Sequence, residues 1–269
     1  MFATSIPEDQ REELIDLLQD TARLQQEHPK LAEYLAISPE LPGTGDHDRD
    51  AQFELGMAYF MTTPAASDNP YWSIVSSMTS TLKGRRIVDG CSPEGTPRLA
   101  FAATVLQDVY AYAIPAPETL KWVTAFAGGQ SLTDVGAGRG YWASQLARGG
   151  LTVHAYDTAP PGSSANDSFT GDGSWYPVRD SRELAITGET VLFLCWPPGW
   201  GDNMASATLA QFEAAGGSRL IYVGEQKGRK TGDDRFFAAL SERWNLVETD
   251  PHFASWWNLD DRAQGWVRR

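Results

Sequence analysis

The sequence predicts an α/β fold whose second half is a doubly wound, mostly parallel sheet. Short apolar runs alternate with helical segments after Pro115, and a glycine-rich turn stands between one such run and the next helix. Strands that alternate with helices imply right-handed crossovers and a parallel sheet. The 269 residues suffice for one large or two smaller domains. Because the pattern changes near Pro115, we expect a helical region over 1–115 and an α/β domain over 116–269.

The first region is expected to be mainly helical, and we assign to it the role of a lid that forms most of the substrate pocket. Apolar residues at helical spacing predict its helices. These helices are expected over 7–26, from Pro29 to before Ser38, and over 51–61, 71–82 and 97–111, with loops over 63–70 and 84–96.

The second region begins with a helix over 117–126, which the pair Gly128-Gly129 stops. Its expected elements then follow in order. These are strand 131–135, helix 141–148, strands 152–156 and 191–194, a helix closing at 212–215, strand 220–223 and helix 234–244. The segments 245–249 and 265–268 are expected to close the sheet as an antiparallel pair.

Composition excludes several classes of function. The net charge of −13 argues against nucleic acid, which requires a basic footprint, and against anionic membrane surfaces. Residues 1–7 lack the pattern of a signal peptide, and no apolar run is long enough to span a bilayer. The cysteines Cys91 and Cys195 are far apart and the four histidines are scattered, so we expect no disulfide and no metal site. We therefore expect a cytoplasmic protein with a small-molecule substrate. The sequence leaves its oligomeric state open.

The run Asp134–Trp142 carries most of the functional information. It reads as the end of a buried strand, a turn with Gly136, Gly138 and Gly140, and the first turn of a helix. Glycines remove the Cβ atoms that would keep a ligand from the backbone, and they permit positive φ. Asp157, at the end of the next strand, is placed to bind the two hydroxyls of a ribose. The alternative for Asp157 is a solvent-facing aspartate that opens a turn.

The glycine spacing distinguishes between cofactors. A dinucleotide fingerprint requires Gly or Ala at position 141, where this chain has Tyr141. The pattern is instead D-x-G-x-G-x-G, beginning at Asp134. From Pro117 onward the chain thereby resembles the class I S-adenosylmethionine-dependent methyltransferases. The resemblance implies a Rossmann-like sheet with closing antiparallel strands, S-adenosylmethionine (SAM) as cofactor and S-adenosylhomocysteine (SAH) as product.

The same resemblance implies which residues hold the cofactor. The backbone of Gly136, Ala137 and Gly138 would carry its amino-acid end, and Asp157 its ribose. Trp175 either stacks on adenine or belongs to the core. The full set expected at the cofactor is Asp134, Gly136, Ala137, Gly138, Gly140, Tyr141, Trp142, Asp157, Thr158, Trp175, Cys195 and Trp196. Shared Ile-Pro, Gly-Ala-Gly-x-Gly-Tyr-Trp and Trp-Pro-Pro elements also resemble a group of uncharacterised bacterial and fungal proteins.

The fourth strand ends in Trp196-Pro197-Pro198. Many members of the family that methylate exocyclic or amide nitrogens carry Asp or Asn before the two prolines, followed by an aromatic residue. This chain has Trp196 and Gly199 at those positions, which argues against a nucleobase or glutamine amine as acceptor. Trp196 either faces the sulfonium or an aromatic substrate, or packs in the interior.

Four residues are candidates for a catalytic role: Tyr110, Tyr112, Trp196 and Glu225. Either tyrosine could close the site, although packing between domains explains them equally well. Glu225 ends the strand after Trp196 and could hold a substrate amine or act as a base. We expect methyl transfer to a small metabolite or natural-product-like acceptor. The alternatives are aminocarboxypropyl transfer or cyclisation of SAM, a non-catalytic cofactor-binding protein and, least favoured, a nicotinamide oxidoreductase.

Overall fold

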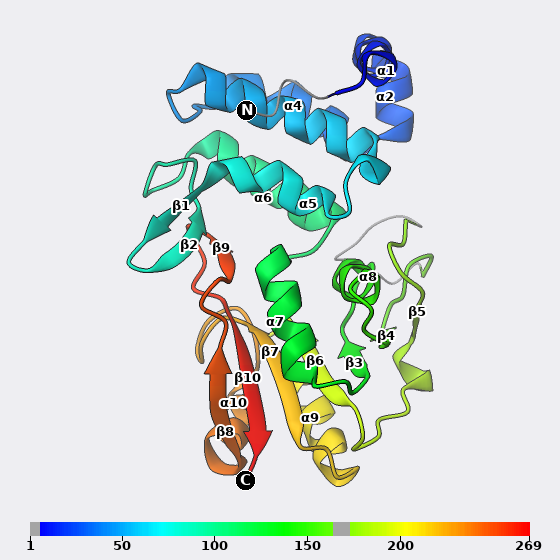
Figure 1. Ribbon diagram of the computed structural model, residues 1–269, viewed down its shortest axis with the longest axis vertical. Helices are drawn as coiled ribbons and strands as arrows, with labels where there is room; N and C mark the ends of the chain where they lie inside the picture. The colour runs from blue at the N-terminus through cyan, green and yellow to red at the C-terminus, as the bar shows by residue number, and fades with distance from the viewer. Residues whose placement is uncertain (1–5, 164–172) are drawn as a thin grey trace. The chain divides into compact units, whose positions relative to one another are not determined.

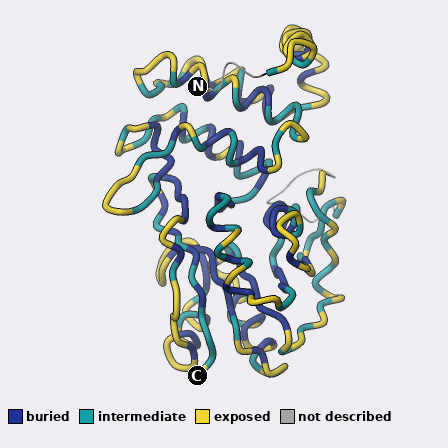
Figure 2. The backbone as a smooth tube through the Cα atoms, viewed as in Figure 1, coloured by how far each residue is buried: buried dark blue, intermediate teal, exposed yellow. Residues whose placement is uncertain are grey.

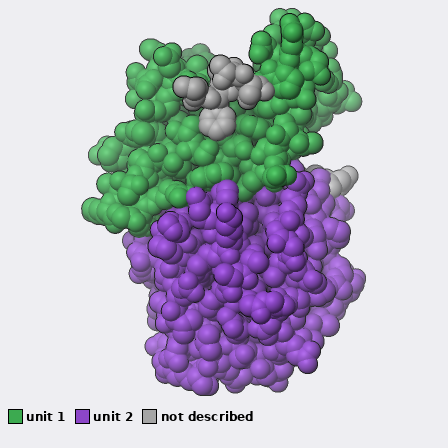
Figure 3. Space-filling model, viewed as in Figure 1, with its two compact units in different colours: residues 1–109, 256–258 green, residues 110–255, 259–269 purple. Residues whose placement is uncertain are grey.

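The computed structural model describes residues 6–163 and 173–269, so Met1–Ser5, where no signal peptide is expected, lie outside it. The chain forms two compact units, 1–109 with 256–258 and 110–255 with 259–269 (Figure 3). The second unit begins at Tyr110 rather than after Pro115 because this segment packs within it. The ring centroids of Tyr110 and Tyr141 are 5.0 Å apart, and Trp142 Nε1 donates a hydrogen bond of 3.1 Å to the Ala113 carbonyl.

Unit 1 is built mainly from helices (Figure 1). They are α1 (Glu8–Gln19), α2 (Thr21–Glu27), α3 (Pro29–Ile37), α4 (His47–Thr62), α5 (Pro70–Val75) and α6 (Pro97–Val109), with 3-10 turns η1 (Ser38–Glu40), η2 (Pro64–Ala66) and η3 (Ser76–Met78). The single helix expected over 7–26 is interrupted at Asp20, whose carboxylate accepts the Arg23 N–H at 3.0 Å and so caps α2.

Unit 1 also contains a hairpin where the sequence predicted a helix over 71–82. After α5 and η3 the chain forms β1 (Thr79–Leu82) and β2 (Arg85–Val88), which pair antiparallel. Lys83 and Gly84, between them, have φ of 50° and 77°. Two consecutive left-handed residues make the two-residue turn that matches the twist of a hairpin. Strand β9 (Ala254–Trp256) completes a three-stranded sheet of order β1-β2-β9, and the sequence analysis missed it.

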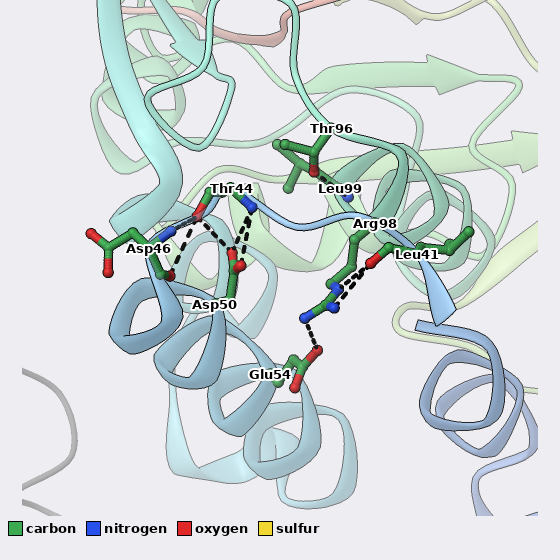
Figure 4. Close-up of polar contacts among 8 residues, drawn as sticks. All are labelled: Leu41, Thr44, Asp46, Asp50, Glu54, Thr96, Arg98 and Leu99. Carbon is green, nitrogen blue, oxygen red and sulfur yellow. Dashed lines mark hydrogen bonds and ion pairs between the residues drawn. The ribbon is translucent and has the colours of Figure 1, made fainter. Parts of the chain in front are cut away.

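A buried carboxylate organises the loop before α4 (Figure 4). Asp50 accepts hydrogen bonds from the backbone N–H and the hydroxyl of Thr44. A Cβ on Gly43 would lie 2.1 Å from Asp50 Oδ2, so a larger residue there would displace the Asp50 carboxylate. Nearby, Arg98 donates to the Leu41 carbonyl and to Glu54 at 3.1 Å. Arg98 therefore stabilises the loop before α4, which belongs to the same unit as Arg98 itself.

Unit 2 contains a seven-stranded sheet of order β5-β4-β3-β6-β7-β10-β8. Its elements are α7 (Pro117–Ala127), β3 (Leu132–Val135), α8 (Tyr141–Arg148), β4 (Val153–Asp157), β5 (Val178–Asp180), η4 (Ser181–Glu183), β6 (Val191–Cys195), α9 (Met204–Ala214), β7 (Arg219–Gly224), α10 (Asp234–Arg243), β8 (Trp244–Thr249) and β10 (Arg262–Arg268). The pairs among β3 to β7 are parallel, whereas β10 runs antiparallel to β7 and β8. The predicted doubly wound sheet with closing antiparallel strands is confirmed.

Helices cover both faces of this sheet. Leu132, Phe193 and Ile221 form a buried cluster with residues of α7 and α8. Their neighbours along the strands, such as Leu192 and Leu220, form a second cluster with residues of α9 and α10. Burial on both faces is why these strands read as continuous apolar runs, and Figure 2 shows the central strands as buried. From β3 the next strands in sequence lie on opposite sides, β4 and β5 on one and β6 and β7 on the other. Such a reversal of strand order creates a crevice at the carboxyl ends of β3, β4 and β6.

Candidate functional site

A cavity of about 640 Å³ lies within unit 2. Its lining comes from the carboxyl ends of β3, β4 and β6, from the segment 110–112 and from the start of α9. Most residues that the sequence analysis proposed for the site lie together here. They are Tyr110, Tyr112, Asp134, Gly136, Ala137, Gly138, Tyr141, Trp142, Asp157, Thr158, Cys195 and Trp196. Gly140, Trp175 and Glu225 are not in its lining.

The glycine loop uses its backbone N–H groups inside the protein. Those of Gly136 and Ala137 donate to the Tyr156 carbonyl at 2.9 and 3.0 Å, and that of Gly138 donates to Asp157 Oδ2 at 2.8 Å. Gly136 and Gly138 have φ of 81° and 55°, as predicted for a reversal that L side chains disfavour. Since its amides are engaged, this loop does not present the nest of N–H groups that binds a diphosphate.

Asp157 is held rigidly at the end of β4. One carboxylate oxygen accepts the Gly138 N–H, and the other accepts the Ala159 N–H at 2.9 Å. Each oxygen of an ionised carboxylate has a further lone pair. Because Asp157 also lines the cavity, it can accept hydrogen bonds from ligand hydroxyls while its own orientation stays fixed.

Asp134 is the most perturbed acid of the cavity. Only 1% of it is exposed, and its Oδ1 has no hydrogen-bond partner among the described residues. Burial, and secondarily the charge of Asp157, raises the pKa of Asp134 to about 8. A third carboxylate, Asp202, also lines the cavity, and no Lys, Arg or His belongs to its described lining. This charge distribution favours a cationic ligand.

One wall of the cavity consists of stacked aromatic rings. Tyr112 and Trp196 lie with centroids 5.4 Å apart and planes 14° from parallel. Trp196 adopts a φ of 54°, which costs a non-glycine residue about 1–2 kcal/mol. Two contacts hold it there: its backbone N–H donates to Val223 O at 2.7 Å, and its Nε1 donates to Asp261 Oδ2 at 3.0 Å. Asp261 is 2% exposed and also accepts the Ser255 hydroxyl.

Trp175 contributes to the site through Tyr110. Its ring stacks on Tyr110 with centroids 5.3 Å apart and meets Tyr141 edge-on at 5.1 Å. Tyr110, 1% exposed, also lines the cavity itself. Trp175 is half-buried, and its contact with adenine stays a prediction.

Gly140 and Glu225 have structural roles. Gly140 caps α8 with a φ of 77°, and a Cβ there would lie 2.9 Å from Tyr176 Cβ. Glu225 is 4% exposed, and its carboxylate accepts the N–H groups of Lys230 at 3.1 Å and Asp260 at 3.2 Å. These bonds tie down the loop after β7, so the expectation of a base at Glu225 has no support from its position.

The sequence analysis missed the side of the cavity formed by η4 and α9. These residues are Ser181, Leu184, Asp202, Asn203, Met204, Ala207, Thr208 and Gln211. The signal available was Asp202-Asn203, two polar residues that follow the Trp-Pro-Pro run at a helix start. Asp202 accepts the Met204 N–H at 2.6 Å, and a Cβ on Gly136 would lie 2.5 Å from Met204 Cε. Met204 thus lies against the glycine loop.

The described residues contain no group of three or more His, Cys, Asp or Glu placed to hold a metal ion. Among the same residues, no helix is long and apolar enough to cross a membrane.

No family model and no curated protein matches this sequence. Solved structures resemble it distantly. Magnesium protoporphyrin IX methyltransferase (ChlM) from Synechocystis PCC 6803 with bound SAM is 15% identical at a TM-score of 0.35, covering 56% of this chain and 76% of that one. The mitomycin 7-O-methyltransferase MmcR is 14% identical at 0.38, covering 82% and 67%. The pyocyanin biosynthetic protein PhzM is 14% identical at 0.37, covering 97% and 93%. Likenesses at these scores carry no argument about the function of this chain.

Proposed function

We propose that this protein transfers the methyl group of SAM to a small-molecule acceptor, with SAH as the product. The observation that carries the proposal is the cavity at the carboxyl ends of β3, β4 and β6, where the strand order of the sheet reverses. The cavity combines the glycine loop, a carboxylate placed to bind ribose hydroxyls, and further acidic residues, and its described lining has no basic residue. SAM has a sulfonium and an α-ammonium, so its reacting end is cationic. A cavity of about 640 Å³ is in the range of small-molecule sites.

The same features argue against a dinucleotide cofactor. A diphosphate needs free amides or cations, whereas the amides of Gly136, Ala137 and Gly138 are engaged and the described lining has no basic side chain. In addition, Tyr141 occupies the position of the third fingerprint glycine. The nicotinamide oxidoreductase is therefore disfavoured by both the sequence and the site.

The residues of the chain divide the binding task by chemistry. Asp157 accepts the ribose hydroxyls, and Asp134 lies where a cationic group would favour its ionised form. Tyr112 covers one face of Trp196, and Trp196 itself lines the cavity, where its ring offers a sulfonium the attraction of an aromatic system. When bound, SAM would supply a methyl group on positively charged sulfur; direct attack by an acceptor on the methyl carbon would break the carbon–sulfur bond and release SAH.

The protein's contribution to the rate is then placement and exclusion of water. Tyr110 and Tyr112 line the same cavity and can enclose the reacting end. Cys195 also lines it, but burial, followed by the charges of Asp134 and Asp261, raises the pKa of its thiol well above the ordinary value. Cys195 therefore remains protonated and does not compete as a nucleophile.

Calorimetric titration with SAM, SAH and NAD tests the cofactor. We expect binding of SAM and SAH and none of NAD. Gly138→Val places a β-branched side chain in the loop and should abolish SAM binding. Gly150→Val is the matched control, because Gly150 has a φ of 88° but lies where a Cβ meets nothing within 4 Å. Undiminished SAM affinity in Gly138→Val would refute the assignment of the site.

Product analysis tests the reaction. Incubation with SAM and a panel of small aromatic and aliphatic acceptors should release SAH. Release of methylthioadenosine would instead indicate aminocarboxypropyl transfer or cyclisation. Binding of SAM without turnover of any acceptor would favour a non-catalytic cofactor-binding protein.

A further inference from the structure

Trp200 is unusually exposed for its size. It follows the Pro197-Pro198-Gly199 turn after β6, and 76% of it faces solvent, the largest value among the exposed large hydrophobic residues described. Its neighbours Pro198 and Asp202 both line the cavity. A tryptophan left in water beside a ligand cavity offers a ligand a large, rigid contact area at little entropic cost.

A basic loop is joined to this turn through the backbone. The segment 226–230, after β7, carries three exposed cations: Lys227, Arg229 and Lys230. Gly199 N–H donates to the Lys230 carbonyl at 3.1 Å, and Gly232 N–H donates to the Pro197 carbonyl at 2.9 Å. A Cβ on Gly199 would lie 2.8 Å from Lys230 O, so the glycine permits this close approach. We call Trp200, Lys227, Arg229 and Lys230 the tryptophan–basic surface.

The base of this surface is held by buried polar groups. Thr231, 1% exposed, shares a hydrogen bond of 2.7 Å with the Tyr222 hydroxyl and accepts the Glu225 N–H at 2.7 Å. The Glu225 carboxylate accepts the Lys230 N–H. The cations therefore extend from an anchored loop, which lowers the entropy that a ligand must offset on binding.

The charge of this surface opposes that of the chain. The whole chain has a net charge of −13, yet three of its 22 basic residues lie within four positions of one another. Two acidic residues close in sequence to this surface accept hydrogen bonds from backbone N–H groups elsewhere. Asp202 accepts the Met204 N–H, and Asp233 caps α10 through the Arg235 and Phe236 N–H groups.

The cations are less constrained. Lys227 meets Asp234 at 3.7 Å in a widely exposed pair, while Arg229 and Lys230 form no ion pair with the described residues. Two cations without an ion pair among the described residues thus stand on a loop whose backbone pairs with the turn that carries the exposed indole, and this combination suits a planar ring with negative charge.

We infer that the tryptophan–basic surface binds the acceptor of the proposed methyl transfer, and that this acceptor is an aromatic molecule bearing a carboxylate or phosphate. The inference rests on the proposed function, since it identifies the second substrate of that site. Trp200 stacks on the ring and the cations hold the anionic group. The net charge of −13 disfavours a nucleic acid or an anionic membrane, because three cations are a small footprint for a polyanion.

Calorimetry with three matched probes, in the presence of saturating SAH, tests this assignment. The probes are 2-naphthoate, 2-naphthyl phosphate and the uncharged 2-naphthamide. We expect both anions to bind about tenfold more tightly than the amide, from charge-assisted bonds to Arg229 and Lys230. A higher affinity for the phosphate identifies a phosphorylated acceptor, and one for naphthoate an aromatic acid.

Variants locate the binding. Trp200→Ala should weaken all three probes about tenfold, from lost stacking. The double variant Arg229→Gln/Lys230→Gln should weaken only the anions, about tenfold, which removes their preference over the amide. The controls Lys121→Gln and Val247→Ala change an exposed cation and an exposed apolar residue elsewhere in unit 2, and should leave every affinity unchanged.

The inference is overturned if the amide binds as well as the anions, if Trp200→Ala leaves naphthoate binding intact, or if none of the probes binds. It is also overturned if Trp200 is required instead for binding phosphatidylserine vesicles or a DNA oligonucleotide. Titration of the same variants with SAM keeps the two proposals apart. Absence of probe binding in a wild-type protein that binds SAM normally refutes the acceptor assignment alone, whereas a wild-type protein that does not bind SAM refutes the proposed function.

Discussion

Replacement of Asp134 by asparagine should change how the stability of the protein depends on pH. The pKa of Asp134 is about 8 in the folded protein, against an ordinary value of 3.8, chiefly because the side chain is buried. Between these values the folded protein keeps a proton that the unfolded chain has released. The free energy of unfolding therefore falls as the pH rises, by about 1.4 kcal/mol per pH unit from this group. The loss of unfolding free energy that is due to Asp134 is therefore on the order of 5 kcal/mol at pH 8, and there is no such loss below pH 4.

Asp134→Asn removes this group and leaves the other acids in place. Urea unfolding of both proteins at pH 5, 6, 7 and 8 isolates its contribution as the difference between the two stability curves. We expect the free energy of unfolding of the variant to gain on that of the wild type by about 1.4 kcal/mol for each unit of pH between 5 and 7. Curves that run parallel would show that Asp134 is ionised throughout, and the argument from burial would fail.

The same group links SAM binding to protons. A bound cation favours the ionised form of Asp134, so SAM should displace a proton below pH 8. Calorimetry at pH 7 in buffers of different ionisation enthalpy measures this release. We expect nearly one proton per SAM in the wild type and none in Asp134→Asn. Equal release by both proteins would assign the proton to another group.

Three further changes test the supporting structure. Gly140→Ala should lower the free energy of unfolding by about 3 kcal/mol, because strain at positive φ adds to the contact with Tyr176. The control Gly216→Ala, with φ of 84° and open space around its Cβ, should lower it by only about 1 kcal/mol. Equal losses in denaturant unfolding would refute the contact. Asp261→Ala should cost about 1–3 kcal/mol by stranding Trp196 Nε1 and the Ser255 hydroxyl, and should be non-additive with Trp196→Phe in a double-mutant cycle. Glu225→Gln should lower the free energy of unfolding by about 1 kcal/mol and leave SAM affinity unchanged. Glu248→Gln, at an exposed position, is its control. A loss of SAM affinity in Glu225→Gln would show that Glu225 does take part in binding.

The sequence predicted the sheet of unit 2 well because its strands are buried on both faces. Apolar runs such as 191–194 and 220–223 admit few other interpretations when helices separate them. The hairpin Thr79–Val88 was missed since its turn, Lys83-Gly84, lacks the usual Asn or Asp and its short strands are only partly buried. Short strands with weak alternation, such as β5 and β9, depend on partners distant in sequence.

The candidate site was predictable where backbone geometry dictates the residue. The backbone of the loop requires glycine at Gly136 and Gly138, where φ is positive, and a carboxylate follows at the end of β4. Both features can be recognised in a single sequence. Side-chain direction has no such signature. Glu225 ends a strand as Asp157 does, but its carboxylate points to the Lys230 and Asp260 amides. Trp175 likewise supports Tyr110, a relation set by tertiary packing alone.

The return of residues 256–258 to unit 1 has a consequence for synthesis and dissection of the chain. Trp256 Nε1 donates to the Tyr71 hydroxyl across 185 residues of sequence, and Trp257 N–H donates to the Val88 carbonyl. During translation the helices of unit 1 emerge before β9, so their small sheet lacks its third strand until Trp256 has left the ribosome. A fragment ending at Val109 would lack the same strand. Completion of unit 1 thus depends on the synthesis of most of unit 2, because the shortest continuous segment that contains all of unit 1 is 1–258.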